Sequence, residues 1–356
     1  MSQTYSVASI GGDGIGPEVC DQARLVLDAA AERFGFALTW AGFDWSCERY
    51  LATGAMVPDD GLAQLAAFDA IFLGAVGYPS VPDHVSLWGL LIPIRRAFDQ
   101  YVNLRPARLL PGVAGPLRDV PTSDLDMVIV RENSEGEYST EGGRYDIGTD
   151  TEGATQVARF TRRGVERIAR YAFEVATARS GRVASATKSN GIVHTMPFWD
   201  EVVDEVAADY PQVELRRFHI DALVARMVTH PGSLDVIVAS NLFGDILSDL
   251  SAALVGGLGL AASGNLNPER TGPSMFESIH GSAPDIAGQG IANPIAQVAA
   301  GAMMLRHLGQ GAAADAVERA VAAVLAAGEV RTPDLGGSAS TADMGAALVA
   351  TLISAT

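Results

Sequence analysis

Two aspartates, Asp245 and Asp249, stand four positions apart in the segment FGDILSDL. On a helix this spacing places both carboxylates on one face, where they repel each other unless a cation lies between them. Asp221, which follows a predicted strand, would supply a third hard oxygen ligand. Such a set suits Mg²⁺ or Mn²⁺, with water or substrate oxygens completing the coordination. The pair alone favours a simpler interpretation, in which Asp245 lies at a helix N-terminus and Asp249 is solvated.

Lys188 is the single lysine among 25 basic residues, and the other 24 are arginines. Arginine is effectively always protonated, whereas an amine can lose its proton when its surroundings lower its pKa. Lys188 is therefore a candidate base, although chance also explains a single count.

Arginines are concentrated in one stretch of the chain. Arg95, Arg96, Arg105 and Arg108 lie within 14 positions, and Arg131 ends a separate predicted strand. Guanidinium groups bind carboxylates through two parallel hydrogen bonds. Converging arginines would hold a dicarboxylic acid. The alternative is that they pair with surface acids, which are abundant in a chain of formal charge −17.

Side chains that could take part in catalysis recur at the ends of the predicted strands. In open α/β sheets, ligands bind beyond the carboxyl ends of the strands. Four strand ends carry reactive side chains here, so the sequence predicts one crowded site. The segments are 131–133 after strand 127–130, 187–190 after 183–186, 219–221 after 213–218 and 241–245 after 234–239, with Tyr138 shortly after the first.

Short apolar runs alternate with helical patterns along the chain, which predicts an α/β fold with a mostly parallel sheet. Thr161 is expected to cap a helix that Gly181 ends. Further strands are expected at 5–10 and 70–73, and helices at 17–33, 161–180, 293–308 and 312–327. The polar, glycine-rich stretch 133–155 is either a floppy loop or an extended ribbon that reaches a second subunit.

Composition limits the class of protein. The chain has 356 residues, of which 48% are hydrophobic, a length comfortable for two domains. A net charge of −17 argues against nucleic-acid and anionic-membrane partners. Cys20 and Cys47 are expected to be reduced thiols, and no signal peptide or apolar span is evident, so a cytoplasmic protein is expected.

A dinucleotide would need a phosphate-binding loop. Gly11–Gly16 is one residue short of the Rossmann pattern G-x-G-x-x-G, and no P-loop motif exists. The better candidate is His280–Pro294, whose small residues leave backbone amides accessible. A structural connection between helices is the alternative.

Together these motifs resemble the β-decarboxylating dehydrogenases, the family of isopropylmalate, isocitrate, tartrate and D-malate dehydrogenases. The matching segments cover nearly the whole chain in order: GGDGIGPE at 11–18, NLRP at 103–106, RENSEGEY at 131–138, ATKSN at 186–190, HID at 219–221, NLFGDILSDL at 241–250 and HGSAPDIAGQGIANP at 280–294.

The resemblance implies a two-domain α/β fold with a mostly parallel sheet core of the isopropylmalate dehydrogenase type, not a Rossmann fold, and a dimerisation ribbon. Residues 1–102 and 257–356 would form a large, discontinuous cofactor-binding domain. Residues 103–256 would form a smaller dimerisation and catalytic domain, with an arm at about 133–155.

The resemblance also implies a role for each candidate residue. Tyr138 would protonate the product carbon and Lys188 would accept the substrate hydroxyl proton. The neighbouring subunit would donate Lys188 and Asp221, so a homodimer with shared active sites is expected. The implied catalytic set is Tyr138, Lys188 and Asp221; the substrate-binding set is Arg95, Arg105, Arg131, Trp88 and Asn190; the metal ligands are Asp221, Asp245 and Asp249; and the cofactor-binding set is His280, Gly281, Ser282, Ala283, Asp285, Ile286 and Asn293.

The implied reaction is oxidation of a dicarboxylic 2-hydroxy acid followed by loss of CO₂. Asp285 would accept hydrogen bonds from both ribose hydroxyls and repel a 2′-phosphate, so NAD is the expected cofactor. Mg²⁺ or Mn²⁺ is expected as well, and assistance by K⁺ is left open.

The substrate is expected to be D-malate, with tartrate as a second substrate. Isopropylmalate enzymes resemble ETGLLSLR before the first clamp arginine, with one residue fewer between glycine and arginine than here. This chain has LWG at 87–89, and RRAFDQYVNLRP (95–106) and NLNPERTGPS (265–274) resemble the tartrate/D-malate branch. Trp88 would fill space that a larger substituent needs. Two departures from the family pattern are Ser278-Ile279 and Pro93, which adds a kink near Arg95.

Three alternatives remain open from the sequence. The nearest is a 3-isopropylmalate dehydrogenase of leucine biosynthesis. The second is a non-catalytic regulatory subunit, and the third is a Mg²⁺-dependent phosphoryl-transfer enzyme, which would leave Tyr138 and Lys188 without a role.

Overall fold

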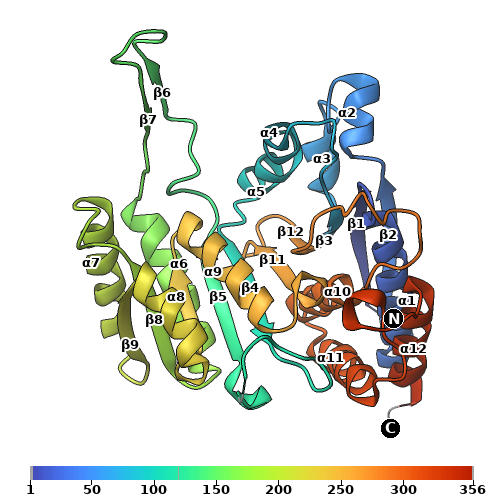
Figure 1. The fold of residues 1–356 in the computed structure, drawn as a ribbon. Helices are drawn as coiled ribbons and strands as arrows, with labels where there is room; N and C mark the ends of the chain where they lie inside the picture. The colour runs from blue at the N-terminus through green and yellow to red at the C-terminus, as the bar shows by residue number, and fades with distance from the viewer. Residues whose placement is uncertain (1–2, 119, 355–356) are drawn as a thin grey trace. The chain divides into compact units, whose positions relative to one another are not determined.

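The computed structural model describes residues 3–118 and 120–354. The chain divides into two compact units that both combine β-strands with helices, as the sequence predicts (Figure 1). Unit 1 comprises Met1–Gln100, Arg108–Thr122 and Ala252–Thr356, and unit 2 comprises Tyr101–Ala107 and Ser123–Ser251. No helix of the described residues is both long and apolar enough to cross a membrane.

Unit 1 contains five strands in the order β2-β1-β3-β12-β11. The pairs of β1 with β2 and β3, and of β3 with β12, are parallel, whereas β11 runs antiparallel to β12. The strands are β1 (Thr4–Gly12), β2 (Ala37–Phe43), β3 (Ala70–Ala75), β11 (Ala262–Leu266) and β12 (Ser274–Ser278). The residues of β3 are all buried, which explains why 70–73 reads as a continuous apolar run.

Two groups of helices belong to unit 1. The long ones, α1 (Gly16–Phe34), α10 (Ile295–His307), α11 (Gly311–Ala327) and α12 (Thr341–Ser354), pack on one another. The short ones are α2 (Cys47–Thr53), α3 (Gly61–Leu65), α4 (Asp83–Ser86), the π-helical turn η1 (Leu87–Leu91), α5 (Ile92–Ala97), and the 3₁₀ turns η4 (Leu258–Leu260) and η5 (Pro333–Leu335). Leu90 and Ile94 are fully buried in a core cluster with strands β1 and β3.

Unit 2 contains the strand order β4-β5-β10-β8-β9. The pairs β5/β10, β10/β8 and β8/β9 are parallel, so their carboxyl ends lie at the same edge. The strands are β4 (Val102–Arg108), β5 (Asp126–Glu132), β8 (Arg182–Thr187), β9 (Glu214–His219) and β10 (Val236–Ala239). The helices are α6 (Arg162–Thr177), α7 (Thr195–Ala208), α8 (Ile220–Thr229) and α9 (Asn241–Leu254), with 3₁₀ turns η2 (Thr122–Asp124) and η3 (Pro231–Ser233).

Helix α6 begins as the sequence predicts, because the Thr161 hydroxyl accepts a hydrogen bond from the Gly164 amide at 3.0 Å. The regular helix ends at Thr177, three residues earlier than expected. Gly181 then adopts a φ of +73°, and its amide donates to the Ala176 carbonyl. Gly181 thus lies in the turn that follows the helix and closes it there.

The stretch 133–155 forms an extended ribbon and not a floppy loop. Strands β6 (Gly142–Tyr145) and β7 (Gly153–Gln156) pair antiparallel and project from the rest of unit 2 (Figure 1). All four residues of β6 are exposed. Nothing in unit 2 itself covers the ribbon, and the reach to a second subunit stays a prediction.

Three segments lie in a different unit from the one expected. Residues 101–102 belong to unit 2 instead of the larger domain, and 108–122 and 252–256 belong to unit 1 instead of the smaller domain. The longest of the three is 108–122. Arg331 donates a hydrogen bond to the Gly112 carbonyl at 3.1 Å, and Gly112 lies directly against the backbone of Leu325 in α11. These contacts hold the segment to the carboxyl-terminal helices.

Candidate active site

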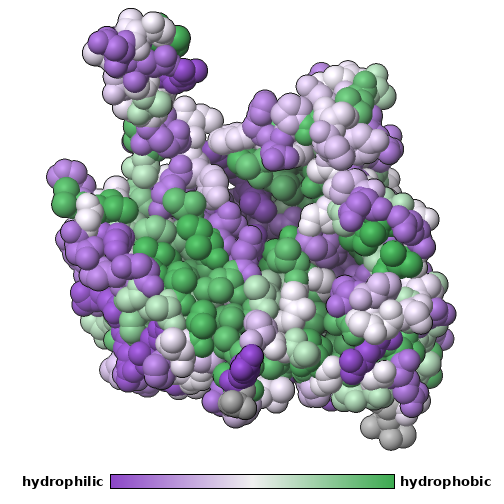
Figure 2. All heavy atoms as spheres, viewed as in Figure 1, coloured by the Kyte–Doolittle hydropathy of each residue, from purple (hydrophilic) through white to green (hydrophobic). Residues whose placement is uncertain are grey.

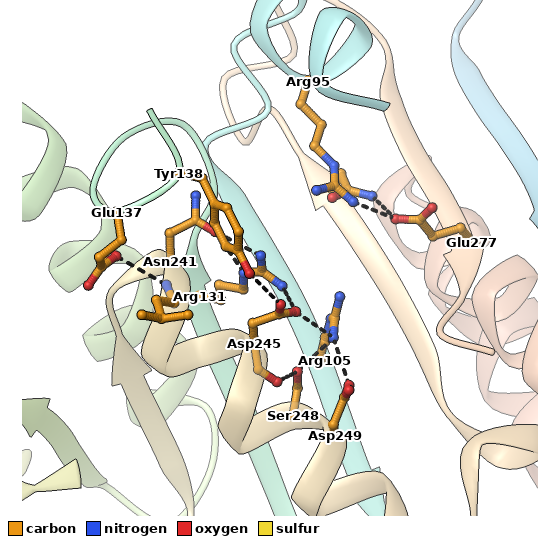
Figure 3. Close-up of polar contacts among 12 residues, drawn as sticks. Arg95, Arg105, Arg131, Glu137, Tyr138, Asn241, Asp245, Ser248, Asp249 and Glu277 are labelled. Atoms are coloured by element: carbon orange, nitrogen blue, oxygen red, sulfur yellow. Dashed lines mark hydrogen bonds and ion pairs between the residues drawn. The ribbon is translucent and has the colours of Figure 1, made fainter. Parts of the chain in front are cut away.

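Two buried arginines and two more accessible aspartates meet in unit 2 (Figure 3). Arg131, near the end of β5, forms a hydrogen-bonded ion pair with Asp245. Arg105 Nη1 lies 3.7 Å from Asp245 Oδ1 and 3.6 Å from Asp249 Oδ1. The arginine side chains are 6% and 10% exposed, against 37% for Asp245 and 67% for Asp249. The four-residue spacing on α9 therefore presents both carboxylates on the face that the arginines approach.

Tyr138 joins this cluster through its hydroxyl, which donates to Asp245 Oδ2 at 2.8 Å. The Arg131 guanidinium carbon lies 5.6 Å from the centre of the Tyr138 ring. Burial, and then the hydrogen bond and charge of Asp245, raise the pKa of Tyr138 against the opposing charge of Arg131. The phenol therefore keeps its proton at neutral pH and is available as a donor.

Burial on its own would raise the pKa of Asp245. The charge of Arg131, the Tyr138 hydroxyl and the charge of Arg105 outweigh that effect, so the pKa of Asp245 lies below its ordinary value. Asp245 is thus ionised at neutral pH, as a cation ligand must be.

Three side chains outside the predicted set of site residues position this cluster. Asn241 Oδ1 accepts from Arg131 Nε at 3.0 Å and from Nη2 at 2.7 Å. Ser248 Oγ accepts from Arg105 Nη1 at 2.6 Å. Glu137 accepts from Ser240 Oγ at 2.7 Å and from the Leu242 amide at 3.1 Å, at the N-terminus of α9. All three side chains lie in motifs quoted above, RENSEGEY at 131–138 and NLFGDILSDL at 241–250, and this was the available signal.

Lys188 and Asp221 form a separate pair in unit 2, with Nζ 2.7 Å from Oδ1. The register Thr187↔His219 between β8 and β9 explains this contact, since Lys188 directly follows the end of β8 and Asp221 lies two residues after the aligned end of β9. The Lys188 hydrogen bond lowers the pKa of Asp221, whose side chain is 69% exposed. Asn190, two residues further on, is exposed.

Asp221 does not join Asp245 and Asp249 within one chain. Among residues 3–118 and 120–354, no three His, Cys, Asp or Glu side chains lie close enough together to hold a metal ion. The three predicted ligands thus fall into two groups in unit 2.

In unit 1, Arg95 on α5 donates from Nη2 to Glu277 Oε1 at 3.1 Å. Asn265 Nδ2 donates to the same oxygen at 2.7 Å. Arg95 Nε is buried and makes no hydrogen bond to the part of the chain that the structure describes. Arg95 therefore has donor capacity left for an anion. Trp88, on the same helical segment, is half-buried and lies with its ring centre 5.0 Å from the Arg96 guanidinium carbon.

The segment His280–Pro294 forms an irregular turn in unit 1. His280 Nδ1 lies 2.9 Å from the Gly281 carbonyl, so the neutral ring carries its proton there. Burial lowers the pKa of His280, and Nε2 is buried without a hydrogen-bond partner in the described structure. Asn293 Nδ2 donates to Asp334 Oδ2 at 3.0 Å, whereas Asp285 is exposed. The remaining residues of the predicted cofactor set, Gly281, Ser282, Ala283 and Ile286, belong to the same turn, in which Ala283 adopts a φ of +40°.

The loop Gly11–Gly16 supports this turn. The Ile15 amide donates to the Ser282 carbonyl at 2.8 Å. A Cβ at Gly14 would lie 2.0 Å from that carbonyl oxygen, so only glycine fits. Ile15 and Val19 also pack against Ile286. The first glycine-rich motif thus shapes the turn at 280–294 by contact.

Comparisons with known proteins agree with this architecture. Residues 6–348 match the family model described as Isocitrate/isopropylmalate dehydrogenase. A D-malate dehydrogenase [decarboxylating] of Escherichia coli K12 is 55% identical over 349 residues, with 96% of each chain covered. A tartrate dehydrogenase/decarboxylase of Pseudomonas putida is 52% identical over 360 residues, covering 99% of this chain and 98% of the relative.

Among solved structures, an isocitrate dehydrogenase from Methylococcus capsulatus aligns with a TM-score of 0.88 at 38% identity, covering 98% of this chain and 99% of that one. A β-decarboxylating dehydrogenase from Thermococcus kodakarensis aligns with a TM-score of 0.80 at 36% identity, covering 98% of this chain and 96% of that one. These matches confirm the family, the fold class and the enzyme class expected from the sequence. The chain belongs to the isocitrate/isopropylmalate dehydrogenase family.

Proposed function

We propose that this enzyme oxidises D-malate with NAD and a divalent metal ion, releasing pyruvate and CO₂, and that it accepts tartrate as a second substrate. The observation that carries the proposal is the cluster in unit 2 where Arg105, Arg131 and Tyr138 converge on Asp245 and Asp249. The names of the D-malate and tartrate relatives support the choice of substrate.

The arginines bind the substrate carboxylates. Arg131 and Arg105 already face a carboxylate, that of Asp245, and a substrate carboxylate competes for the same donors. Arg95 contributes its buried Nε, which has no partner in the described structure, while its Nη2 donates to Glu277.

Asp245 and Asp249 fit a divalent cation, because both are hard oxygen donors and the low pKa keeps Asp245 ionised. A bound Mg²⁺ or Mn²⁺ supplies electrostatic stabilisation of negative charge on the substrate's hydroxyl oxygen. Asp221 completes the ligand set from a second copy of the chain, since it does not reach the other two within its own.

Lys188 and Tyr138 move the protons. Lys188 accepts the proton of the C2 hydroxyl while C2 is oxidised, and NAD, when bound, would supply the hydride acceptor. The C3–C4 bond then breaks, CO₂ departs, and the electron pair left behind at C3 takes the proton of the Tyr138 phenol. The raised pKa of Tyr138 keeps that proton in place until this step.

The turn 280–294 fits an adenosine group. The lone pair on His280 Nε2 is a buried acceptor that has no partner in the described structure, and Asp285 presents an exposed carboxylate. That carboxylate would accept hydrogen bonds from the two ribose hydroxyls of NAD and would repel the 2′-phosphate of NADP. Unit 1 is accordingly the cofactor-binding domain of the proposal.

A homodimer brings the shared residues together. Helices α8 and α9 expose apolar side chains, among them Val228 (40%), Leu242 (37%) and Ile246 (49%). Green spheres gather over these two helices in Figure 2. Val193, in the segment after Lys188, is a further exposed apolar side chain, at 67%. A contiguous apolar patch of this kind marks an interface, and a two-fold axis would carry Lys188 and Asp221 to the partner's cluster.

The substrate is tested by NADH formation with Mn²⁺ and K⁺ across D-malate, L-tartrate, 3-isopropylmalate and isocitrate. The proposal expects the highest kcat/KM for D-malate, with L-tartrate second. Preference for 3-isopropylmalate would leave the roles of the metal and Lys188 standing but overturn the substrate assignment.

A further inference from the structure

Tyr138 occupies the middle of a tight turn in unit 2. The Ser139 amide donates to the Glu137 carbonyl at 3.0 Å, which closes a three-residue γ-turn around Tyr138. From this turn the phenol faces Asp245 (Figure 3). A turn with one internal hydrogen bond does not fix its own direction in the fold. The direction of the Tyr138 side chain therefore depends on what holds the residues before and after it.

The residues before Tyr138 are held by the starts of two helices. Glu135 accepts from the Thr161 amide at 2.8 Å and from the Thr161 hydroxyl at 2.9 Å, at the start of α6. Glu137 is bound in a similar way at the start of α9. Gly136, between them, exchanges two backbone hydrogen bonds with Arg159, at 2.9 and 3.2 Å. The chain is therefore fixed up to the first residue of the γ-turn.

The residue after Tyr138 is held by the ribbon. Ser139 Oγ donates to the Val157 carbonyl at 2.6 Å. Gln156 Nε2 donates to the Ser139 carbonyl at 2.9 Å and to the Ser139 hydroxyl oxygen at 3.1 Å. Within residues 3–118 and 120–354, every hydrogen-bond partner of Ser139 lies between Glu137 and Val157. The return strand of the ribbon, and not a helix, thus holds this side of the γ-turn.

The ribbon reaches the γ-turn through an unbroken series of hydrogen bonds. Gln156 is the last residue of β7, and its backbone pairs with Gly142 of β6. Its side chain extends to Ser139, three positions before β6 begins. The next amide, that of Val157, donates to the Glu141 carbonyl at 2.9 Å. Main-chain and side-chain bonds therefore continue the β6/β7 pairing as far as the turn that carries Tyr138.

We propose that Gln156 and Ser139 are positioning residues for proton transfer by Tyr138: their hydrogen bonds hold the γ-turn so that the phenol stays directed at Asp245 and delivers its proton to C3 of the substrate. Both residues act through the turn and not on the substrate. In the proposed function, on which this inference rests, Tyr138 is the proton donor. The base of the ribbon thus takes part in the reaction through the orientation of that donor.

Gln156→Ala removes both side-chain bonds to Ser139 and leaves the backbone pairing of β7 in place. We expect kcat for D-malate to fall about 10- to 100-fold, since a misplacement of about 1 Å can cost a factor of about 100. The KM values for D-malate and NAD should not change, because the arginines and the turn 280–294 keep their contacts.

Thr155→Ala is the matched control at the neighbouring position of β7. The Thr155 hydroxyl lies 3.5 Å from the Gly143 carbonyl and makes no hydrogen bond to Ser139 in the described structure. Thr155→Ala should therefore keep the wild-type kcat, although it changes an exposed side chain of the same strand.

The Ser139 hydroxyl provides a second pair of variants, which also covers the case in which Gln156→Ala does not fold. Ser139→Ala loses the bond to the Val157 carbonyl and one of the two from Gln156, and it should lower kcat as Gln156→Ala does. Ser139→Thr retains a hydroxyl and should regain most of the lost rate.

A double-mutant cycle with Tyr138→Phe separates positioning from a general loss of structure. Tyr138→Phe removes the proton donor and should be slow by itself. If Gln156 acts through Tyr138, adding Gln156→Ala to Tyr138→Phe should cause no further loss of kcat, because both changes affect one step. A purely structural role of Gln156 would multiply the two losses.

Wild-type kcat in a folded Gln156→Ala or Ser139→Ala variant would overturn the inference, and so would losses that multiply with Tyr138→Phe. A loss that disappears at high enzyme concentration would also overturn it, since it would come from a weakened dimer. Failure of the proposed function gives different results. In that case Tyr138→Phe itself keeps the wild-type kcat, or the wild type releases no pyruvate from D-malate.

Discussion

Asp245 receives hydrogen bonds from Arg131 and Tyr138 and lies 3.7 Å from Arg105. These neighbours keep its pKa low in spite of burial. The same contact holds the Tyr138 proton, because an ionised acceptor strengthens the bond from a phenol. One carboxylate thus links the proposed metal ligands, the carboxylate-binding arginines and the proton donor.

Lys188→Arg tests the proposed base at the scale of one residue. Arginine keeps the positive charge beside Asp221 but cannot lose its proton. We expect kcat for D-malate to fall about 1,000-fold, the usual contribution of a general base, while NADH binds as before in a fluorescence titration. Arg216→Lys, at an exposed arginine of the same unit, serves as the control and should remain active. Normal turnover by Lys188→Arg would show that Lys188 is not the base.

Glu132 gives a pH dependence of stability. Burial raises its pKa to about 7, although Ser134 and Glu135 donate hydrogen bonds to it. The folded state therefore holds a proton that the unfolded state releases above about 4.5. The stabilisation is fully present below that pH and is lost as the pH rises to about 7.

The test is Glu132→Gln, which cannot titrate. Wild-type stability should fall by on the order of 2 kcal/mol between pH 4.5 and 7 through this group, and the variant should lack that part of the slope. Urea unfolding at both pH values measures it. Parallel slopes in the two proteins would mean that Glu132 is not protonated in the folded state.

At the scale of elements, α9 depends on Glu137, which accepts from Ser240 and from the Leu242 amide at the helix N-terminus. Glu137→Ala leaves these donors without an acceptor and should cost about 1–2 kcal/mol of stability. Because α9 carries Asp245 and Asp249, the Mn²⁺ concentration for half-maximal activity should rise several-fold.

Glu141→Ala is the matched control for Glu137→Ala, because Glu141 pairs with Arg159 on the exposed ribbon and touches nothing in α9. It should lose less stability and keep the wild-type response to Mn²⁺. If both variants needed the same Mn²⁺ concentration for half-maximal activity, Glu137 would have no role in positioning the site.

Local patterns made several elements predictable. The Thr161 cap, the buried run of β3 and the strand ends that carry Arg131 and Lys188 all follow from short-range rules. Glu277 could not be found in this way, because its partner Arg95 lies 182 positions away in the sequence. The sequence also singled out Pro93, where a kink was predicted. In the structure the helix instead widens into a π turn beside Gly89 and the core.

The antiparallel pair β11 and β12 was missed, because the segments ASGNL and SMFES lack both a continuous apolar run and strict alternation. Both are nevertheless fully buried. The spacing of residues also could not reveal that Asp221 lies apart from the other two aspartates. The same three aspartates would stand in the sequence whether one copy of the chain or two supplied the ligands of one metal ion.

At the scale of the whole molecule, a shared site can be tested by mixing two inactive variants. Asp221→Asn and Asp245→Asn should each abolish activity. After denaturation and joint refolding, half of the dimers would be mixed and each would hold one intact site, so about a quarter of wild-type activity should return. Two variants at residues of the same site, Asp245→Asn with Asp249→Asn, should give no recovery. The absence of recovery in the first mixture would place Asp221 and Asp245 in one subunit's site.

Oxidative decarboxylation of D-malate is tested most directly by the stoichiometry of NADH, pyruvate and CO₂ from one D-malate reaction, with Mn²⁺ and again after metal removal by EDTA. We expect equal amounts of all three products with Mn²⁺ and none after EDTA, with activity restored when Mn²⁺ is returned. NADH formed without matching pyruvate and CO₂, or undiminished after metal removal, would contradict it.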